Sequence, residues 1–112
     1  MADSLAVLLM AYGGPDNLAD VEPYLLDVRG GRPTSRELVE EIRHRYELIG
    51  GGSPILPLTQ AQGAALAAEL GVPVYTGMRH WHPYIADTVE RIVADRHRRL
   101  VAIVMAPHYS TM

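Results

Sequence analysis

The sequence predicts an α/β fold of the three-layer αβα type, built on a parallel sheet. Three apolar segments, at 5–10, 72–77 and 100–107, are separated by segments with helical periodicity. The first and the third do not alternate apolar with polar residues, which is typical of strands covered on both faces. Strands that are joined through helices lie parallel and connect right-handedly. The predicted order of elements is βααβαβ.

The stretch "GGPDN" after the first strand is typical of a tight turn into a helix. Asp16 is placed to cap that helix, and apolar residues recur at helical spacing across 18–28. Pro23 is compatible with the helix only in its first turn, where no backbone N–H is needed. The sequence therefore predicts a helix here without fixing its first residue.

Two further helical patterns precede the second strand. Thr34 and Glu37 have the spacing of a capping box, for a helix that runs to Ile49 and stops at the glycines 50–52. An alanine-rich helix then begins near Thr59 and ends at the glycine before the second strand.

The segment "HPYIADTVERIVADRHRRL" predicts an amphipathic helix between the second and third strands. Its apolar side holds Tyr84 or Ile85, Thr88 or Val89, and Ile92. The arginines at its end suit the negative end of the helix dipole.

Composition limits the classes of function. With 112 residues the chain is the size of one domain or of part of one. A formal net charge of -3 offers no positive field for nucleic acid or anionic lipid. The absence of cysteine excludes a disulfide, a thiolate zinc site and an iron–sulfur cluster in this segment. The first apolar run follows an acid and is far shorter than the roughly 20 residues that cross a bilayer, so we expect a cytoplasmic protein with no transmembrane segment.

Side chains that can carry chemistry gather where the predicted strands end. In open parallel sheets, ligands bind at the carboxyl ends of the strands. The loops at these ends are "AYGGPD", "YTGMRHWHPY" and "APHYSTM". They contain Tyr12, Tyr75, His80, Trp81, His82, His108 and Tyr109. We therefore expect a ligand site at this edge.

Two features of these loops admit more than one interpretation from the residues alone. The usual glycine-rich phosphate motifs are absent, so Gly13 and Gly14 indicate a tight turn. The glycines 50–52 fit either a helix stop or a close approach of the backbone to a flat ligand. His80 and His82 chelate a metal if the loop is extended; otherwise they are ordinary loop histidines.

A set of segments in a fixed order resembles the N-terminal part of the ferrochelatases. The segments are "LLMAYGGPD", "VRGGR", "RHRYELIGGGSPI", "LTQAQ", "YTGMRHWHPYIADTVERI" and "IVMAPHYST". The resemblance covers essentially the whole chain, and its most specific parts are "GGGSP", "GMRHWHP" and "APHYST". Within the family, a tyrosine at position 12 resembles the Gram-positive branch, the coproporphyrin III ferrochelatases.

The resemblance implies a Rossmann-like chelatase fold and an enzyme of haem biosynthesis that inserts Fe(II) into a porphyrin. Coproporphyrin III is the expected substrate, with protoporphyrin IX as the other candidate. No cofactor is implied beyond the substrate Fe(II), and the full-length enzyme is expected to be a monomer. Residues 1–112 correspond to the N-terminal part of the first domain. The rest of that domain and a second domain, with the histidine and glutamate that bind the metal, are expected outside this segment, so the segment alone is expected to be inactive.

Positions that match the family motifs carry implied roles. Tyr12 is the implied catalytic residue: it lies over the macrocycle and provides an axial oxygen ligand to the iron. The implied porphyrin-contact positions are Arg29, Arg45, Tyr46 and Ser53. Their guanidinium groups match the propionates, and their hydroxyls are hydrogen-bond donors. His80 matches a position of an outer metal site, where His82 replaces the carboxylate expected two residues later.

Two other classes of function remain open. One is a single-domain chelatase of the sirohydrochlorin type, which shares the architecture at about this size. That group is expected to carry a histidine at the end of the first strand, where this chain has Tyr12. The other is a non-catalytic tetrapyrrole-binding protein, in which Tyr12 and Arg29 hold the ligand without turnover.

Overall fold

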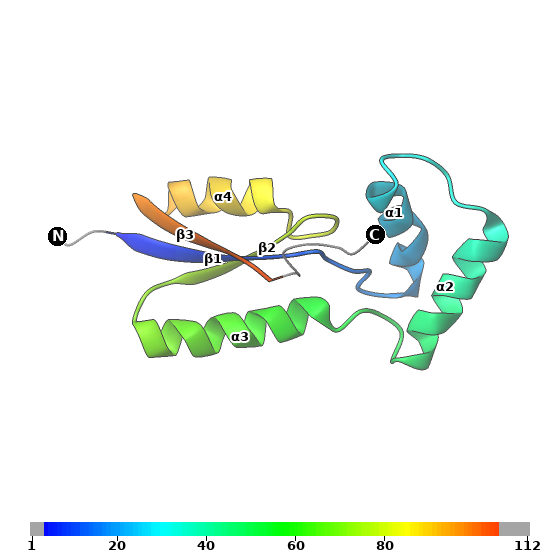
Figure 1. Ribbon diagram of the computed structural model, residues 1–112, viewed down its shortest axis with the longest axis horizontal. Helices are drawn as coiled ribbons and strands as arrows, with labels where there is room; N and C mark the ends of the chain where they lie inside the picture. The colour runs from blue at the N-terminus through cyan, green and yellow to red at the C-terminus, as the bar shows by residue number, and fades with distance from the viewer. Residues whose placement is uncertain (1–3, 106–112) are drawn as a thin grey trace, which may run out of the picture.

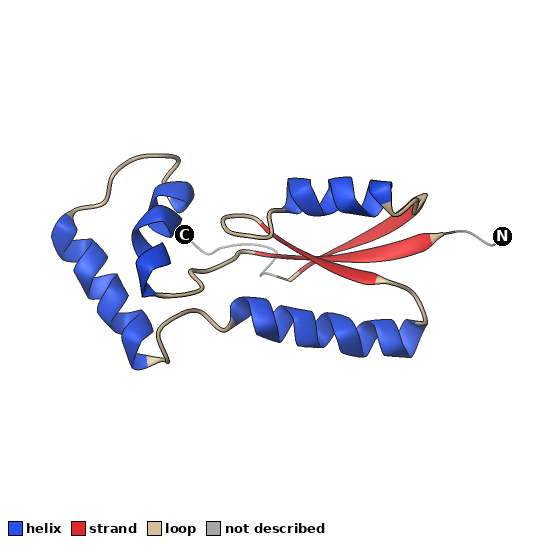
Figure 2. Ribbon diagram, turned by 180° about the vertical axis from the view of Figure 1, so that it is seen from behind, coloured by secondary structure: helices blue, strands red, loops and turns tan. Residues whose placement is uncertain are grey.

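A computed structural model describes residues 4–105 of the chain. Its elements in chain order are β1 (Leu5–Ala11), a 3₁₀ turn η1 (Leu18–Asp20), α1 (Val21–Val28), α2 (Arg36–Leu48), α3 (Ile55–Leu70), β2 (Val74–Met78), α4 (Ile85–Ala94) and β3 (Arg99–Val104). All three strands are parallel, in the order β2-β1-β3. Helix α3 covers one face of the sheet and α4 the other (Figure 1 and Figure 2). The predicted α/β class with a parallel sheet is therefore confirmed.

The predicted order βααβαβ is one helix short. Three helices lie between β1 and β2, so the order is βαααβαβ. Each of these three helices was predicted as a separate segment, α1 with 8 residues and α2 with 13 among them, and only the summary order counts one too few. Pro23 lies in the first turn of α1, the position that its missing N–H requires.

The core forms where β1 is covered from both sides. Ala6 and Leu8 pack with Ile92 of α4, and partly buried Ile85 and Val89 join them. These helix positions confirm the predicted apolar side of α4. On the opposite face, a Cβ at Gly63 of α3 would lie 3.3 Å from Val74 and 3.5 Å from Leu9. Alternate residues of one strand thus meet different helices, as the pleat requires.

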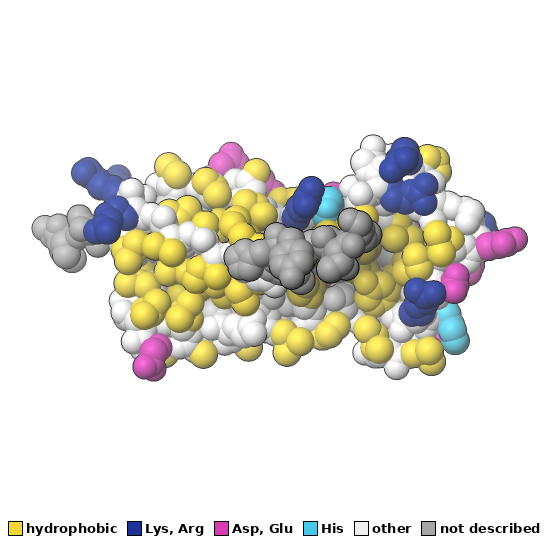
Figure 3. All heavy atoms as spheres, viewed as in Figure 1, with side chains coloured by type: hydrophobic (Ala, Val, Ile, Leu, Met, Phe, Trp, Pro, Cys, Tyr) yellow, Lys and Arg dark blue, Asp and Glu magenta, His cyan; other side chains and the backbone are white. Residues whose placement is uncertain are grey.

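Strand β3 forms one edge of the sheet within the described residues, and all six of its side chains are exposed. The exposed fraction is 48% for Val101 and 51% for Val104. Figure 3 shows hydrophobic side chains gathered over this strand. A parallel strand is normally buried on both faces. The described part of the chain instead leaves the apolar residues of β3 uncovered.

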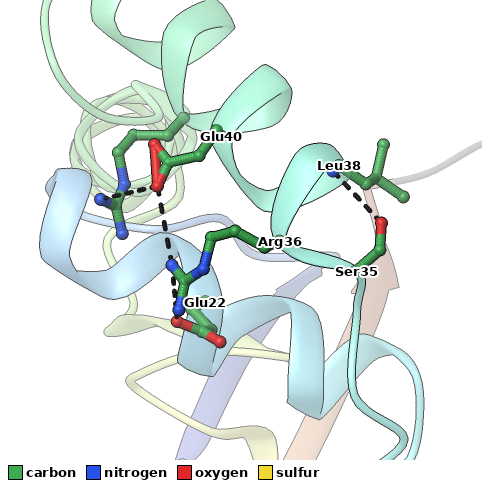
Figure 4. A network of polar contacts seen from close by, with 6 residues as sticks. Glu22, Ser35, Arg36, Leu38 and Glu40 are labelled. Carbon is green, nitrogen blue, oxygen red and sulfur yellow. Dashed lines mark hydrogen bonds and ion pairs between the residues drawn. The ribbon is translucent and has the colours of Figure 1, made fainter.

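Helices α1 and α2 lie beyond the carboxyl end of β1 and pack against each other there (Figure 1). Arg36 joins them, 3.8 Å from Glu22 of α1 and 3.6 Å from Glu40 of α2 (Figure 4). These groups are exposed, so the pairs contribute little to stability. Within residues 4–105, no helix combines the length and apolar character that a bilayer crossing needs.

Three predicted helix boundaries are wrong. Asn17, not Asp16, supplies the capping oxygen after the first strand, and it accepts from the N–H of Asp20. Helix α3 begins four residues before Thr59, and the Thr59 hydroxyl instead donates to a carbonyl one turn earlier. Helix α4 ends at Ala94, so most of the arginines expected in its last turn lie beyond it.

The cap of α2 is Ser35 rather than Thr34, and this difference gives a testable expectation. The Ser35 hydroxyl accepts from the N–H of Leu38 at 3.3 Å (Figure 4). Replacing Ser35 with alanine is expected to lower the free energy of unfolding by about 1 kcal/mol. Thr34→Ala is the matched control, because the buried Thr34 hydroxyl has no hydrogen-bond partner within residues 4–105. Urea unfolding of both variants checks the assignment, which equal losses would contradict.

Candidate functional site

The loops that follow β1 and β2 run side by side at the carboxyl edge of the sheet. The N–H of Arg79 donates to the carbonyl of Ala11 at 2.9 Å, and that of His80 donates to the carbonyl of Tyr12 at 2.9 Å. These bonds continue the pairing of the strands for two residues past their ends. They bring the rings of Tyr12 and His80 into an edge-on contact, with centroids 4.8 Å apart.

A carboxylate from α1 holds the second of these loops. Asp27 Oδ1 lies 2.8 Å from Nδ1 of His80, and Asp27 Oδ2 accepts from the hydroxyl of Tyr84 at 2.5 Å. Burial raises the pKa of Asp27, but the hydrogen bonds from Tyr84 and His80 outweigh it and hold the pKa below its ordinary value. Asp27 is therefore an ionised acceptor at neutral pH, with both oxygens engaged.

Tyr24 of α1 contacts the loop that follows β1. The hydroxyl of Tyr24 donates to the carbonyl of Gly13 at 3.3 Å, and its ring meets Trp81 edge-on at 6.2 Å. Burial raises the pKa of Tyr24, and the nearby charges of Tyr46, Tyr12 and Asp27 raise it further. Burial also raises the pKa of Tyr46 of α2.

The glycine segment after α2 packs on the turn after β1. A Cβ on Gly52 would lie 2.2 Å from the carbonyl oxygen of Asp16, and a Cβ on Gly14 would lie 2.6 Å from Ser53. The N–H of Ser53 also donates to the carbonyl of Pro15 at 2.8 Å. The close approach considered for these glycines is therefore made by another loop of the chain rather than by a flat ligand. Gly50 and Gly51, with positive φ and open space, end α2 as predicted.

Two cavities open beside Ala11, the last residue of β1. One, of about 210 Å³, is mainly apolar and is lined by Met10, Ala11, Tyr12, Arg79, Ile85 and Val104. The other, of about 360 Å³, is lined by Ala11, Ser53, Pro54, Ile55, Leu58, Thr59, Gln62 and Met105. A further cavity, of about 390 Å³, lies along β2 between α3 and α4, and no predicted site residue except Tyr75 lines it. Tyr12 and Ser53 thus border hollows on either side of one strand end.

Within residues 4–105, neither Arg29 nor Arg45 makes a hydrogen bond or a cation–π contact with Tyr12. Arg29 is partly buried at the end of α1, and its Nε has no hydrogen-bond partner in residues 4–105. Arg45 is exposed on α2 and pairs with Glu41 at 2.9 Å, an i,i+4 pair that costs little to break. Both arginines lie on the helices beyond the carboxyl edge of the sheet.

The expectation that Tyr75 lies at this edge is wrong, and the extended loop that chelation by both His80 and His82 would need is not observed. His80 and His82 do not share a site, because the loop is bent: His80 faces Asp27, while the His82 ring contacts those of Trp81 and Tyr84. Tyr75 lies near the start of β2, where its hydroxyl donates to Asp95 at the far end of α4. It belongs to the amino edge of the sheet.

Some of the predicted site residues lie beyond the part of the chain that the structure describes. His108 and Tyr109, with the loop "APHYSTM" from residue 106 on, lie outside the described residues. Within residues 4–105, no three His, Cys, Asp or Glu side chains are grouped to hold a metal ion.

Asp27 and Tyr84 were not among the site residues predicted from the sequence. Asp27 lies three residues after Tyr24, so the two share a face of α1. A carboxylate beside a buried aromatic residue was therefore a sequence signal that could have identified Asp27 as a site residue. Its partners follow 53 and 57 residues later, and only the fold brings them together.

Tyr84 provides a test of this network by pH. The hydrogen bond to Asp27, then burial, raises the pKa of Tyr84 to about 12. A raised pKa stabilises the fold below the ordinary value of about 10, and this stabilisation is lost as pH rises towards 12. In absorbance titration of tyrosinate, Tyr84→Phe is expected to remove a phenol that ionises near pH 12. Loss of a phenol that ionises near pH 10 would contradict the network.

Sequence comparisons agree on one family. A protein-family model described as "Ferrochelatase" matches residues 4–112. The chain is 49% identical over 110 residues to a protein named ferrochelatase from Acidobacterium capsulatum, with 98% of this chain and 34% of that protein covered. It is 47% identical to a ferrochelatase from Deinococcus radiodurans, with 96% and 36% covered. It is 40% identical to a coproporphyrin III ferrochelatase from Oceanobacillus iheyensis, again with 96% and 36% covered. The chain spans about a third of the length of the curated relatives it matches.

Proposed function

Because the chain belongs to the ferrochelatase family, we propose that it forms one wall of a cleft in which a longer enzyme inserts Fe(II) into a porphyrin. The observation that carries the proposal is the position of Tyr12. Tyr12 is 43% exposed at the carboxyl edge of the sheet, borders an apolar cavity and contacts the His80 ring. An exposed aromatic ring over an apolar hollow suits a flat macrocycle, and its phenol oxygen suits iron.

The reaction has three requirements, and the named residues meet two of them, the grip on the macrocycle and the supply of ligands for the metal. A macrocycle must be gripped, its pyrrole N–H protons must be accepted, and the metal must be delivered without its water. We assign the axial oxygen to Tyr12. We assign the grip to Arg29 and Arg45, through propionates, and to Tyr46 and Ser53, through hydroxyl hydrogen bonds. His80 remains a candidate outer ligand for incoming metal.

We further propose that residues 1–112 are the N-terminal part of the first domain of this enzyme. The relatives extend far beyond the matched segment, and the exposed apolar side chains of β3 are the kind of surface that further chain covers. The segment alone is then expected to lack part of the cleft and to be inactive.

Coproporphyrin III is the substrate we favour. Among the relatives, that from Oceanobacillus iheyensis is named for coproporphyrin III, and so are two from strains of Staphylococcus epidermidis, each 37% identical to this chain. Coproporphyrin carries four propionates where protoporphyrin carries two, so the two arginines that we assign to the propionates, Arg29 and Arg45, favour it.

The test is anaerobic Fe(II) insertion by the full-length protein into coproporphyrin III and protoporphyrin IX, followed by the Soret band. We expect turnover, with the higher kcat/KM for coproporphyrin III. Porphyrin binding without metal insertion would point instead to a non-catalytic tetrapyrrole-binding protein. A preference for protoporphyrin IX would overturn the substrate assignment alone. Activity of the isolated 112-residue chain would contradict its placement as part of a larger cleft.

A further inference from the structure

Asp27 connects α1 to the loop between β2 and α4 and, through His80, to Tyr12 at the end of β1. It lies near the end of α1, and its two oxygens meet two residues of the loop between β2 and α4. One of these, His80, contacts Tyr12 at the end of β1. The side chains of Asp27 and His80 are 26% and 16% exposed, so water competes only partly for their contact.

The contact decides which nitrogen of His80 carries the proton. An ionised carboxylate only accepts hydrogen bonds, and Asp27 Oδ1 lies 2.8 Å from Nδ1. A lone pair on Nδ1 at that distance would face another lone pair, so Nδ1 must carry the hydrogen. In the neutral ring, Nε2 then holds the lone pair.

Tyr84 keeps Asp27 in this orientation. Its hydroxyl occupies the second oxygen at 2.5 Å, so the carboxylate cannot turn away from His80 without losing a bond. Tyr84 is itself fixed as the residue before α4, and it pairs with Met78 at the end of β2. The network therefore rests on three regular elements, which is the usual way in which a functional imidazole is held.

We propose that Asp27 is a positioning residue that sets the tautomer of His80, so that a nitrogen lone pair is held beside Tyr12 in the cleft. The inference rests on the proposed function, because a lone pair there matters only if a porphyrin and Fe(II) come to this edge. A neutral imidazole nitrogen suits either the pyrrole proton or the incoming metal. Asp27 contacts neither, and it acts through His80.

The test variant is Asp27→Asn in the full-length protein. Asparagine keeps the shape of aspartate, and with its oxygen accepting from Tyr84, as Oδ2 of Asp27 does, it presents an N–H to Nδ1. The hydrogen of the imidazole then moves to Nε2. In an established Ser-His-Asp enzyme, the same exchange preserves geometry and lowers kcat by giving the wrong tautomer. Tyr84→Phe is the matched control, because it frees the second oxygen of Asp27 but keeps the carboxylate, which in any orientation only accepts from Nδ1.

The first readout is independent of activity. Nitrogen NMR of ¹⁵N-histidine-labelled protein at alkaline pH, with His80 assigned by its absence in His80→Ala, reports which ring nitrogen is protonated. We expect Nδ1–H in the wild type and in Tyr84→Phe, and Nε2–H in Asp27→Asn. Nε2–H in the wild type would overturn the proposal even if Asp27→Asn fails to fold, and even if the protein inserts no metal.

The second readout separates positioning from folding. We expect Asp27→Asn to lower kcat for Fe(II) insertion by about tenfold while KM for coproporphyrin III stays unchanged. In the His80→Ala background, the same substitution is expected to have no further effect, because Asp27 acts through the imidazole. An equal additional loss in that background, or a change confined to KM, would overturn the proposal. If the wild type inserts no metal, the proposed function fails, and the tautomer measurement still decides the structural part.

Discussion

Replacing Gly52 with alanine is expected to destabilise the protein by about 3 kcal/mol, at the upper end of the cost of overpacking. The added Cβ would lie 2.2 Å from the carbonyl oxygen of Asp16 and 2.7 Å from its carbon. Those atoms are backbone, and they are held by the Asn17 cap on one side and by the bond from Ser53 to Pro15 on the other. Neither loop can yield without breaking these bonds.

Gly51→Ala separates this packing effect from backbone conformation. Gly51 has a φ of +95°, but a Cβ there meets nothing within 4 Å. Its replacement is expected to cost about 1 to 2 kcal/mol, through the unfavourable left-handed backbone alone. Urea midpoints of the two full-length variants make the comparison. If Gly51→Ala is the more damaging, the two loops are not packed as described.

The sheet could be predicted from the sequence because the short, continuous apolar run of β1 fits a strand buried on both faces and is too short for a buried helix. Val7 and Leu8 are 3% and 1% exposed, so the strand is apolar on both faces and shows no alternation. Helix boundaries were harder to predict. Thr34 and Ser35 are neighbours with the same hydroxyl chemistry, and the two candidate caps lie one residue apart. The rotation of the backbone at the helix start selects between them, and spacing does not encode it.

The candidate site could be predicted where it follows from topology, and not where it follows from side-chain direction. Parallel strands end at one edge, which placed the Tyr12 and His80 loops together. Tyr75 was grouped with them by closeness in sequence, although it starts its strand rather than ending it. Asp27 was missed because its partners are remote in the chain. A close approach of the backbone to a flat ligand was one of two interpretations of glycines 50–52, but packing of one loop on another leaves the same sequence signal as contact with a ligand.

Replacing Tyr12 with phenylalanine is expected to leave the fold intact and to lower kcat for Fe(II) insertion by at least about tenfold. The Tyr12 hydroxyl makes no hydrogen bond within residues 4–105, so its loss should change stability by less than about 0.5 kcal/mol. The ring, with its contact to His80, remains. What disappears is the proposed axial oxygen, so the absorption spectrum of the iron product complex should also shift.

Tyr46→Phe is the matched control for this prediction, since it removes a phenol oxygen from a proposed porphyrin contact on α2. A lost hydrogen bond to bound porphyrin raises KM and leaves kcat nearly unchanged, because the bond is the same in the ground state and the transition state. A lost iron ligand instead lowers kcat, because iron reaches that oxygen only as insertion proceeds. If Tyr12→Phe behaves like Tyr46→Phe, with an unaltered product spectrum, then Tyr12 only supports the macrocycle and the axial ligand is another group.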